Sequence, residues 1–195
     1  ESAWTNFVST YTLANQPSSD AFGTITDTII QAKWTVNSNP AGTEFYSENQ
    51  TAATNSGWQV DAVDWVSTPL TSNTQYTFQV KARNENNVDT DYQNLSSTYT
   101  LAALPGAAAF TNIGETGIQA NWTDSNPNAP DFYVECHDNG SYTNLIDNSG
   151  WLVDTTLWNK NSGLTENTTY WFRVKVRNDV DAVTAGWSEL GGRCT

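Results

Sequence analysis

The sequence predicts an all-β protein made of two similar β-sandwiches in tandem, preceded by one strand that belongs to neither. Apolar residues alternate with polar ones over short runs, as at Ile118, Ala120 and Trp122. Asn-Pro, Asp-Asn-Gly and Ser-Gly turns interrupt these runs, and the chain repeats itself. Alternation with a period of two is typical of strands buried on one face, and no helical period is present. Two such sheets bury their apolar faces against each other.

The repeat is clearest in one long segment. Residues Leu70–Asn84 recur as Leu164–Asn178 with 10 of 15 positions identical. Upstream tryptophans and prolines recur as well, and the changing offset places about five inserted residues between Cys136 and Asn148. We therefore expect two domains, residues 17–103 and 104–195.

A third copy of the last strand opens the chain. Residues Trp4–Pro17 match Tyr92–Pro105 at 8 of 14 positions, so residues 1–16 are expected to be the last strand of a preceding repeat. The final strand of the second domain carries Gly191-Gly192, and glycine pairs weakly in a strand. If one molecule donates its first strand to this edge in the next, head-to-tail filaments form. The donor residues would be Thr10, Tyr11, Thr12 and Leu13.

Composition excludes several partners. The 195 residues include 8 basic and 21 acidic ones, for a net charge of −13. An acidic chain is repelled by phosphate backbones and anionic lipid, so nucleic acid and membrane surfaces are poor partners. No apolar run is long enough for membrane insertion, and no leader precedes Glu1, which predicts a mature chain or an excised segment.

The repeated motifs carry a family resemblance. A tryptophan on an early strand (Trp34, Trp122) is followed by Leu-Thr-x-Asn-Thr-x-Tyr and then by Phe-x-Val-x-x-Arg-Asn. This pattern resembles the fibronectin type III domain, which implies an immunoglobulin-like sandwich whose corner tyrosine, Tyr76 or Tyr170, caps a turn with its hydroxyl. The additional tryptophans are similar to those of domains in large microbial secreted or cell-surface proteins. The resemblance implies an extracellular or cell-surface location.

Most of the nine tryptophans are predicted to be core anchors because they fall at repeated positions. Seven do so: Trp34, Trp58, Trp65, Trp122, Trp151, Trp158 and Trp187. Trp171 differs, since it replaces Thr77 of the first repeat and is expected to face outward. It is the candidate glycan contact.

Basic residues gather on one strand of each repeat. Their expected neighbours include Glu48 and Glu135, which would form cross-strand ion pairs. The two readings are a surface charge ladder stacked by Trp187 and a ligand-binding stripe. The five residues are Lys81, Arg83, Arg173, Lys175 and Arg177.

The sequence argues against catalysis, cofactors and metal. His137 is the sole histidine, and its neighbour Cys136 points to the opposite face of a strand, so they are not a nucleophile and its base. The acidic loops 87–91, 124–128 and 178–181 lack the spacing of a calcium loop, which favours turn chemistry. We expect no enzyme, no cofactor and no metal site.

Two kinds of covalent modification are open. A disulfide between Cys136 and Cys194 would stabilise the second domain by about 4 kcal/mol. A strand between the two cysteines would hold their Cα atoms too far apart unless the strand ends converge, so this bond and its alternatives, free buried thiols or an interchain bond, are equally open. Asn-x-Ser/Thr acceptors for N-glycosylation are weak signals in this composition. They are Asn49, Asn94, Asn121, Asn139 and Asn167.

Three functions follow. The first is a structural spacer or building block of a surface protein, because the apolar linker Leu101–Gly106 is too short for free swivelling. The second is a filament subunit that polymerises by strand donation. The third is a glycan-binding module centred on Trp171. The expected partners are copies of the chain or neighbouring repeats, and possible glycans.

Overall fold

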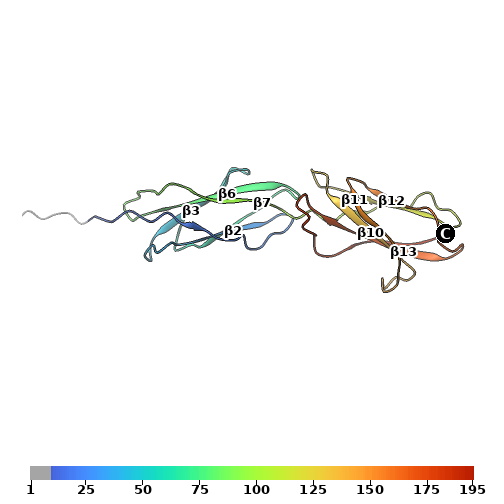
Figure 1. Cartoon of the computed structure of the whole chain (residues 1–195). Coiled ribbons are helices and arrows are strands. Elements are labelled where there is room, and N and C mark those ends of the chain that lie inside the picture. Colours follow the sequence, from blue (N-terminus) through green and yellow to red (C-terminus); the bar gives the residue numbers. More distant parts are fainter. Residues whose placement is uncertain (1–9) are drawn as a thin grey trace, which may run out of the picture. The chain divides into compact units, whose positions relative to one another are not determined.

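The computed structural model describes residues 10–195, which form strands and turns (Figure 1). These residues contain no helix, and therefore none long and apolar enough to cross a membrane. The chain divides into two compact units. Unit 1 is Glu1–Ile25, Ile29–Pro69 and Gln75–Thr98, and unit 2 is Thr26–Thr28, Leu70–Thr74 and Tyr99–Thr195. The predicted first strand falls partly on residues 1–9, outside the described residues.

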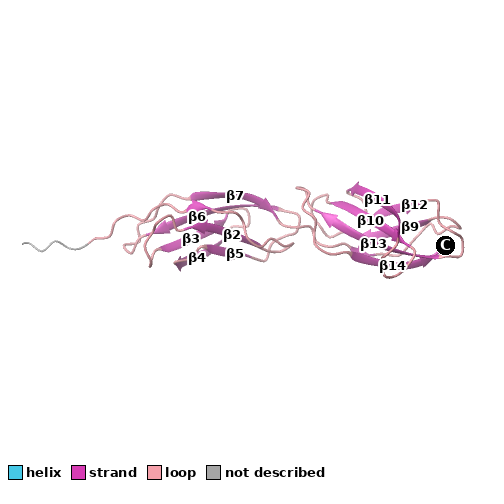
Figure 2. Ribbon diagram, turned by 60° about the horizontal axis from the view of Figure 1, so that its bottom comes forward, coloured by secondary structure: helices cyan, strands magenta, loops and turns pink. Residues whose placement is uncertain are grey.

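The first repeat forms two antiparallel sheets (Figure 2). One sheet has the order β1-β2-β5 and the other β4-β3-β6-β7. The strands are β1 (Ser18–Ser19), β2 (Ile30–Thr35), β3 (Glu44–Asn49), β4 (Thr54–Val60), β5 (Asp64–Ser67), β6 (Gln75–Arg83) and β7 (Gln93–Tyr99).

The second repeat has the same arrangement, with sheets β12-β9-β8 and β11-β10-β13-β14. The two repeats thus form the two predicted sandwiches, each with a three-stranded and a four-stranded sheet. The strands are β8 (Gly106–Ala107), β9 (Ile118–Thr123), β10 (Asp131–His137), β11 (Leu145–Val153), β12 (Leu157–Lys160), β13 (Thr169–Arg177) and β14 (Ser188–Cys194).

The period of two decides which residues enter the core. On β13, Tyr170, Phe172, Val174 and Val176 are buried, while the residues between them are half-buried on the other face. Successive side chains of a strand point to opposite faces, so one strand serves the core and the outer surface at once. The predicted inward positions of this strand are confirmed.

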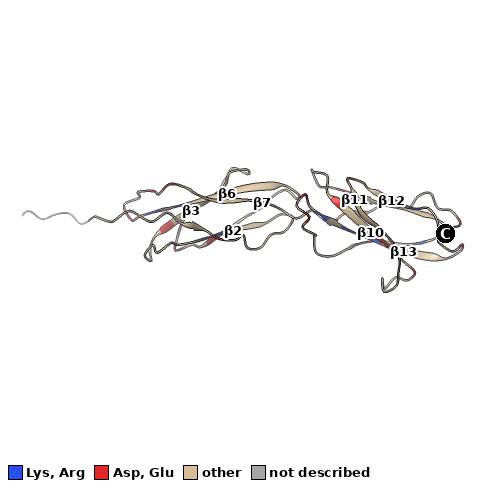
Figure 3. Cartoon of the chain, in the orientation of Figure 1, with Lys and Arg blue, Asp and Glu red and all other residues tan. Residues whose placement is uncertain are grey.

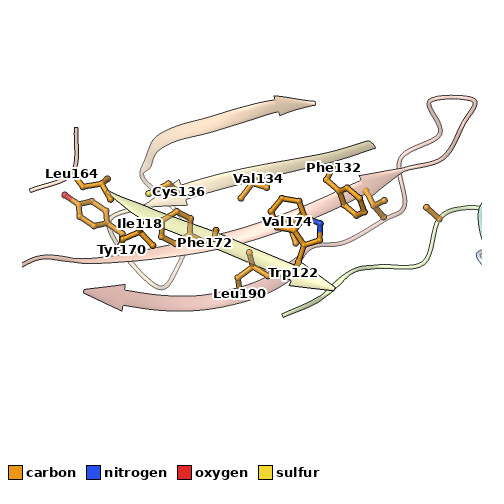
Figure 4. Packing of buried hydrophobic residues seen from close by; sticks show 13 residues of the cluster. Ile118, Trp122, Phe132, Val134, Cys136, Leu164, Tyr170, Phe172, Val174 and Leu190 are labelled. Carbon is orange, nitrogen blue, oxygen red and sulfur yellow. The ribbon is translucent and has the colours of Figure 1, made fainter. Parts of the chain in front are cut away.

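The core of the second sandwich is closed by aromatic rings (Figure 4). Trp122 and Phe132 lie with ring centroids 5.4 Å apart. Phe172 is fully buried and packs against Phe110 at 5.3 Å and Trp158 at 6.2 Å. A buried ring of this size stabilises the fold by about 1.5–3 kcal/mol through burial alone.

The corner before β13 has the predicted tyrosine. The Thr165 backbone N–H donates to the Tyr170 hydroxyl at 2.9 Å, and Leu164 is buried beside it. The hydroxyl satisfies a turn donor that no strand partner reaches, which fixes the entry of the chain into β13. In the first repeat Tyr76 is buried at the corresponding position.

Tyr170→Phe is expected to lower the free energy of unfolding by about 1 kcal/mol, because it removes this hydrogen bond and little packing volume. The urea midpoint of the intact chain measures the change. Val153→Ala, at a side chain 72% exposed, is the control and should change stability by less than about 0.5 kcal/mol. Equal midpoints for Tyr170→Phe and the unchanged chain would contradict the assigned corner.

Candidate functional site: a cation–aromatic ladder on each sandwich

The outer face of the four-stranded sheet carries a row of cations between aromatic rings. On β13, Arg173, Lys175 and Arg177 occupy alternate outward positions. Aromatic rings lie between these cations. They belong to Tyr133 on β10, Trp151 on β11 and Trp187 just before β14. We call this row the ladder of the second sandwich.

The cations stack closely on the rings. The Arg173 guanidinium carbon lies 4.2 Å from the Trp187 ring centroid, and Arg177 lies 4.5 Å from Trp151. The Lys175 ammonium lies 4.8 Å from Trp187 and 4.6 Å from Tyr133. A cation this close to a ring face is attracted by the ring quadrupole, by about 0.5–1 kcal/mol at a partly exposed site.

Carboxylates complete the ladder, whose charges can be followed in Figure 3. Arg173 contacts Glu135 at 2.7 Å, as predicted, and Arg177 contacts Asp131 at 2.7 Å. Lys175 has no carboxylate within ion-pair distance among residues 10–195, so its charge is held by rings alone. Each pair is half-exposed, and its contribution is reduced by solvent.

The first sandwich has a shorter ladder. Arg83 stacks on Trp58 at 4.3 Å and pairs with Glu44, and Lys81 pairs with Asp89. The expected ion pair of Glu48 is wrong: this carboxylate accepts a hydrogen bond from the Gln79 amide at 2.7 Å. The reason is the sequence of β6, which has Gln79 where β13 has Arg173.

One tyrosine of the first ladder is strongly perturbed. Burial, followed by the nearby Glu48 carboxylate, raises the pKa of Tyr92 to about 12. The phenol therefore stays neutral throughout the physiological range, and its ring lies 5.1 Å from the Lys81 ammonium.

Three predicted core tryptophans belong to the ladders instead. Trp58, Trp151 and Trp187 are half-buried and lie over cations. The other four do face the cores: Trp34 and Trp122 are buried, while Trp65 and Trp158 pack on Phe78 and Phe172. Recurrence in the repeat marked all seven as structural, but recurrence alone does not say which face of the sheet a ring covers.

Lys175→Met and Trp187→Leu are expected to couple in stability by about 0.5 kcal/mol, because each removes one partner of the same stack. Urea unfolding of the two single variants and the double variant measures the coupling. Lys160→Met combined with Trp187→Leu is the control, since Lys160 pairs with Asp147. Coupling no larger than in the control would show that the stack contributes nothing.

Trp171 lies beyond the end of the ladder and covers two glycines. It faces Gly192 across the β13–β14 pair. A Cβ built on Gly192 would lie 2.8 Å from the indole nitrogen, and one built on Gly140 would lie 3.0 Å from it. The indole is half-buried and rests on backbone that only glycine leaves clear. Of the two glycines that predicted a weak edge, Gly192 therefore has a packing reason.

Gly192→Ser is expected to destabilise the chain by about 1–3 kcal/mol, because the added Cβ displaces the indole. Trp171→Thr in the same chain should recover most of that loss, since Thr77 and Ser97 occupy the corresponding positions of the first repeat. The thermal unfolding midpoints of the single and the double variant measure both changes in stability. If Trp171→Thr does not restore the stability that Gly192→Ser removes, the destabilisation does not come from the clash with the indole.

The structure has no bond between the two cysteines, so it does not support the Cys136–Cys194 disulfide. Cys136 is fully buried in the core, and burial raises the pKa of its thiol to about 12, which keeps it protonated and unreactive. Cys194 was predicted to face inward but is exposed. A β-bulge opposite Phe172/Arg173 shifts the register of β14 and reverses the faces beyond it, and β13 separates the two strands.

His137 is buried on the side of the sheet opposite Cys136. Its Nε2 lies 3.0 Å from a Glu135 oxygen, and the Tyr142 ring covers it at 5.3 Å. Tyr142 comes from the loop 138–144, within the predicted insertion. The geometry fits no base acting on the Cys136 thiol, and residues 10–195 contain no cluster that could hold a metal ion.

The five glycosylation acceptors differ in accessibility. Asn49 is fully buried, and its amide donates to Ser67 Oγ at 3.1 Å, so this site is closed in the folded chain. Asn121 donates to the Ala109 carbonyl. Asn139 is bonded within its own loop. Asn94 and Asn167 are exposed.

The segments that precede the two sandwiches are held alike. The Asn84 amide donates to the Thr12 carbonyl at 2.9 Å, and the Asn178 amide donates to the Thr100 carbonyl at 3.0 Å. The two asparagines are the last residues of the repeated motif. We call residues 10–16 and 98–104 the joint segments.

A second asparagine grips each joint segment from the other side. Asn39 accepts from the Asn15 N–H at 2.7 Å and donates to the Asn15 carbonyl at 2.7 Å. Asn126 makes the same two bonds to Ala103, at 2.7 and 3.1 Å. A side-chain amide that satisfies both polar groups of one residue imitates a neighbouring strand. The predicted donor residues Thr10 to Leu13 lie in the first of these segments.

Known proteins share the fold. No family model and no curated protein matches the chain. A two-domain fibronectin type III segment from chicken tenascin is 12% identical, with 93% of this chain and 100% of that chain covered and a TM-score of 0.58. The fold is that of tandem fibronectin type III domains. The FN1–FN3 domains of chicken CNTN1 are 13% identical, with 89% and 65% covered and a TM-score of 0.39.

Proposed function

We propose that the chain is a non-catalytic structural module, a semi-rigid spacer in an extracellular or cell-surface protein. The observation that carries this is the paired grip on both joint segments, Asn84 with Asn39 and Asn178 with Asn126. A joint segment fixed at two residues to the sandwich that follows it has few conformations, and this supports the spacer proposal.

The ladders support a structural role. Each cation of the second ladder already has a ring or a carboxylate from its own sheet, so the groups that could recognise an anion are engaged internally. The chain has 21 acidic against 8 basic residues, so the charges that remain without an internal partner are mostly acidic. Exposed Asn94 and Asn167 are the acceptors we expect to be glycosylated in an exported chain.

Strand donation is the competing proposal. It requires Thr10 to Leu13 to leave the first sandwich, which breaks the Asn84 bond to Thr12 and the Asn86 bond to Thr10. The exposed side chains of Tyr11 and Leu13, 53% and 72% accessible, favour some further contact of this segment. The glycan-binding proposal has less support, because the Trp171 indole rests against Gly192 and Gly140.

A spacer is expected to keep the mass of one chain at every concentration, and light scattering of the intact chain measures it. Asn84→Ala loosens the first joint segment and Asn178→Ala, the matched control, loosens the second. Both should remain single chains if the proposal holds. If the measured mass of the intact chain rises with concentration, and rises more in Asn84→Ala but not in Asn178→Ala, the result would favour strand donation instead.

A further inference from the structure

The loop 138–144 of the second sandwich contains the dipeptide Asn139-Gly140, which occurs once in the 195 residues. A glycine after an asparagine leaves its backbone nitrogen unshielded, because glycine has no Cβ. That nitrogen can attack the asparagine side chain at Cγ and close a cyclic imide. Water reaches both residues, since Asn139 is half-buried and Gly140 is exposed. The dipeptide is therefore a place where the chain can modify itself.

The loop holds the side-chain oxygen of Asn139 with three donors. This oxygen accepts from the Ser141 N–H at 3.2 Å, and from the Thr143 N–H and hydroxyl at 3.3 Å each. The bond from Ser141 is an Asx turn, which folds the side chain back over the peptide group of Gly140. Negative charge develops on the same oxygen when Cγ is attacked, and donors that are already in place there lower the barrier.

The nitrogen of the same side chain faces a carboxylate. The Asn139 Nδ2 donates to the Asp138 Oδ1 at 2.8 Å. The side-chain amide is thus oriented at both ends, with its oxygen toward three donors and its nitrogen toward an acceptor. Nδ2 is the leaving group of the reaction, and a neighbouring negative charge favours its protonation as it departs. Asp138 is exposed, so the released ammonia enters solvent directly.

Two other loops hold an asparagine in the same way but lack the glycine. The Asn84 oxygen accepts from the backbone N–H groups two and four residues further on, at 3.1 and 3.0 Å. The Asn178 oxygen does the same at 3.2 and 2.9 Å. Glu85 and Asp179 follow them in the chain, and both asparagines are buried. Asn84 and Asn178 are therefore internal references that have the turn without the reactive dipeptide.

We propose that Asn139 deamidates spontaneously in the folded chain and that the loop 138–144 promotes the reaction. The Gly140 nitrogen attacks Cγ and loses its proton to Nδ2, the bond between Cγ and Nδ2 breaks, and ammonia leaves a cyclic imide. Water then adds to one of the two imide carbonyl carbons and opens the ring. The products are aspartate and isoaspartate, and water is the only co-reactant. This proposal is independent of the spacer function.

The modification changes the end of the second ladder. Either product adds a negative charge to a chain whose net charge is already −13, and removes the glycosylation acceptor at Asn139. Isoaspartate also lengthens the backbone before Gly140, which rests against the Trp171 indole. Tyr142 of the same loop lies with its ring 5.1 Å from the Arg173 guanidinium carbon. Isoaspartate is therefore expected to loosen the loop from the outer face of the sheet.

The test incubates the intact, unglycosylated chain in its folded state at neutral pH. Ion exchange follows the more acidic form, and peptide mass spectrometry locates the change, which is expected at Asn139 and not at Asn84 or Asn178. Thr143→Val should slow the reaction by about two- to tenfold, because it removes one of the three donors to the side-chain oxygen. Thr143→Ser, the matched control, keeps the hydroxyl and should react at the unchanged rate.

Two outcomes would overturn the proposal. In the first, Asn139 reacts more slowly in the folded chain than in the chain unfolded in urea, which would mean that the loop protects the dipeptide. In the second, the unchanged chain and Thr143→Val react at the same rate, which would mean that the Thr143 hydroxyl does not assist the attack.

A second measurement tests the effect on the loop. The Tyr142 N–H donates to the Asn139 carbonyl at 3.2 Å, and its hydrogen exchange should be about tenfold faster in the purified isoaspartate form, where this bond is lost. Asn139→Asp has the added charge without the longer backbone, so it is the matched control and should keep the slow exchange. Equal exchange in the two forms would overturn the loosening of the loop.

Discussion

The strict alternation of β13 and β6 is the constraint on which the rest of the structure depends. One face of β13 supplies Phe172 and Val174 to the core, and the other supplies Arg173 and Lys175 to the ladder. Because side chains of a strand can point only to one face or the other, a shift of one residue would put cations in the core and rings in solvent. The ladder and the core therefore favour the same strand register, and a shift of register would lose the stabilising contacts of both.

The ladder also offsets the repulsion between neighbouring cations. The chain has a net charge of −13, and five of its eight basic residues lie on β6 and β13. Grouping them beside one another costs repulsion, which the carboxylates of Glu135 and Asp131 and the interleaved rings offset. Apart from these five cations, the charged side chains of the chain are mostly acidic.

Repetition extends to the joint segments. Asparagine is suited to gripping a segment of backbone because its side chain offers both a donor and an acceptor. The chain uses it twice at the start of each sandwich, and the fibronectin type III fold supplies the loops that bring Asn39 close to Asn15 and Asn126 close to Ala103. The proposed function rests on the ends of the domains rather than on a pocket.

The sequence alone determined the fold class, the doubling, the inward residues of the strands and the corner tyrosine, because each is local or recurs with the repeat. Tertiary structure alone decided which face three tryptophans cover, that Asn49 is buried, and that Cys194 faces outward. A single bulge in β14 turns the Cys194 side chain to the outer face, and the alternation of apolar and polar residues does not predict a bulge. The partners of Asn84 and Asn178 are some 70 to 80 residues away in the chain, so only the folded backbone could bring the joint segments to them.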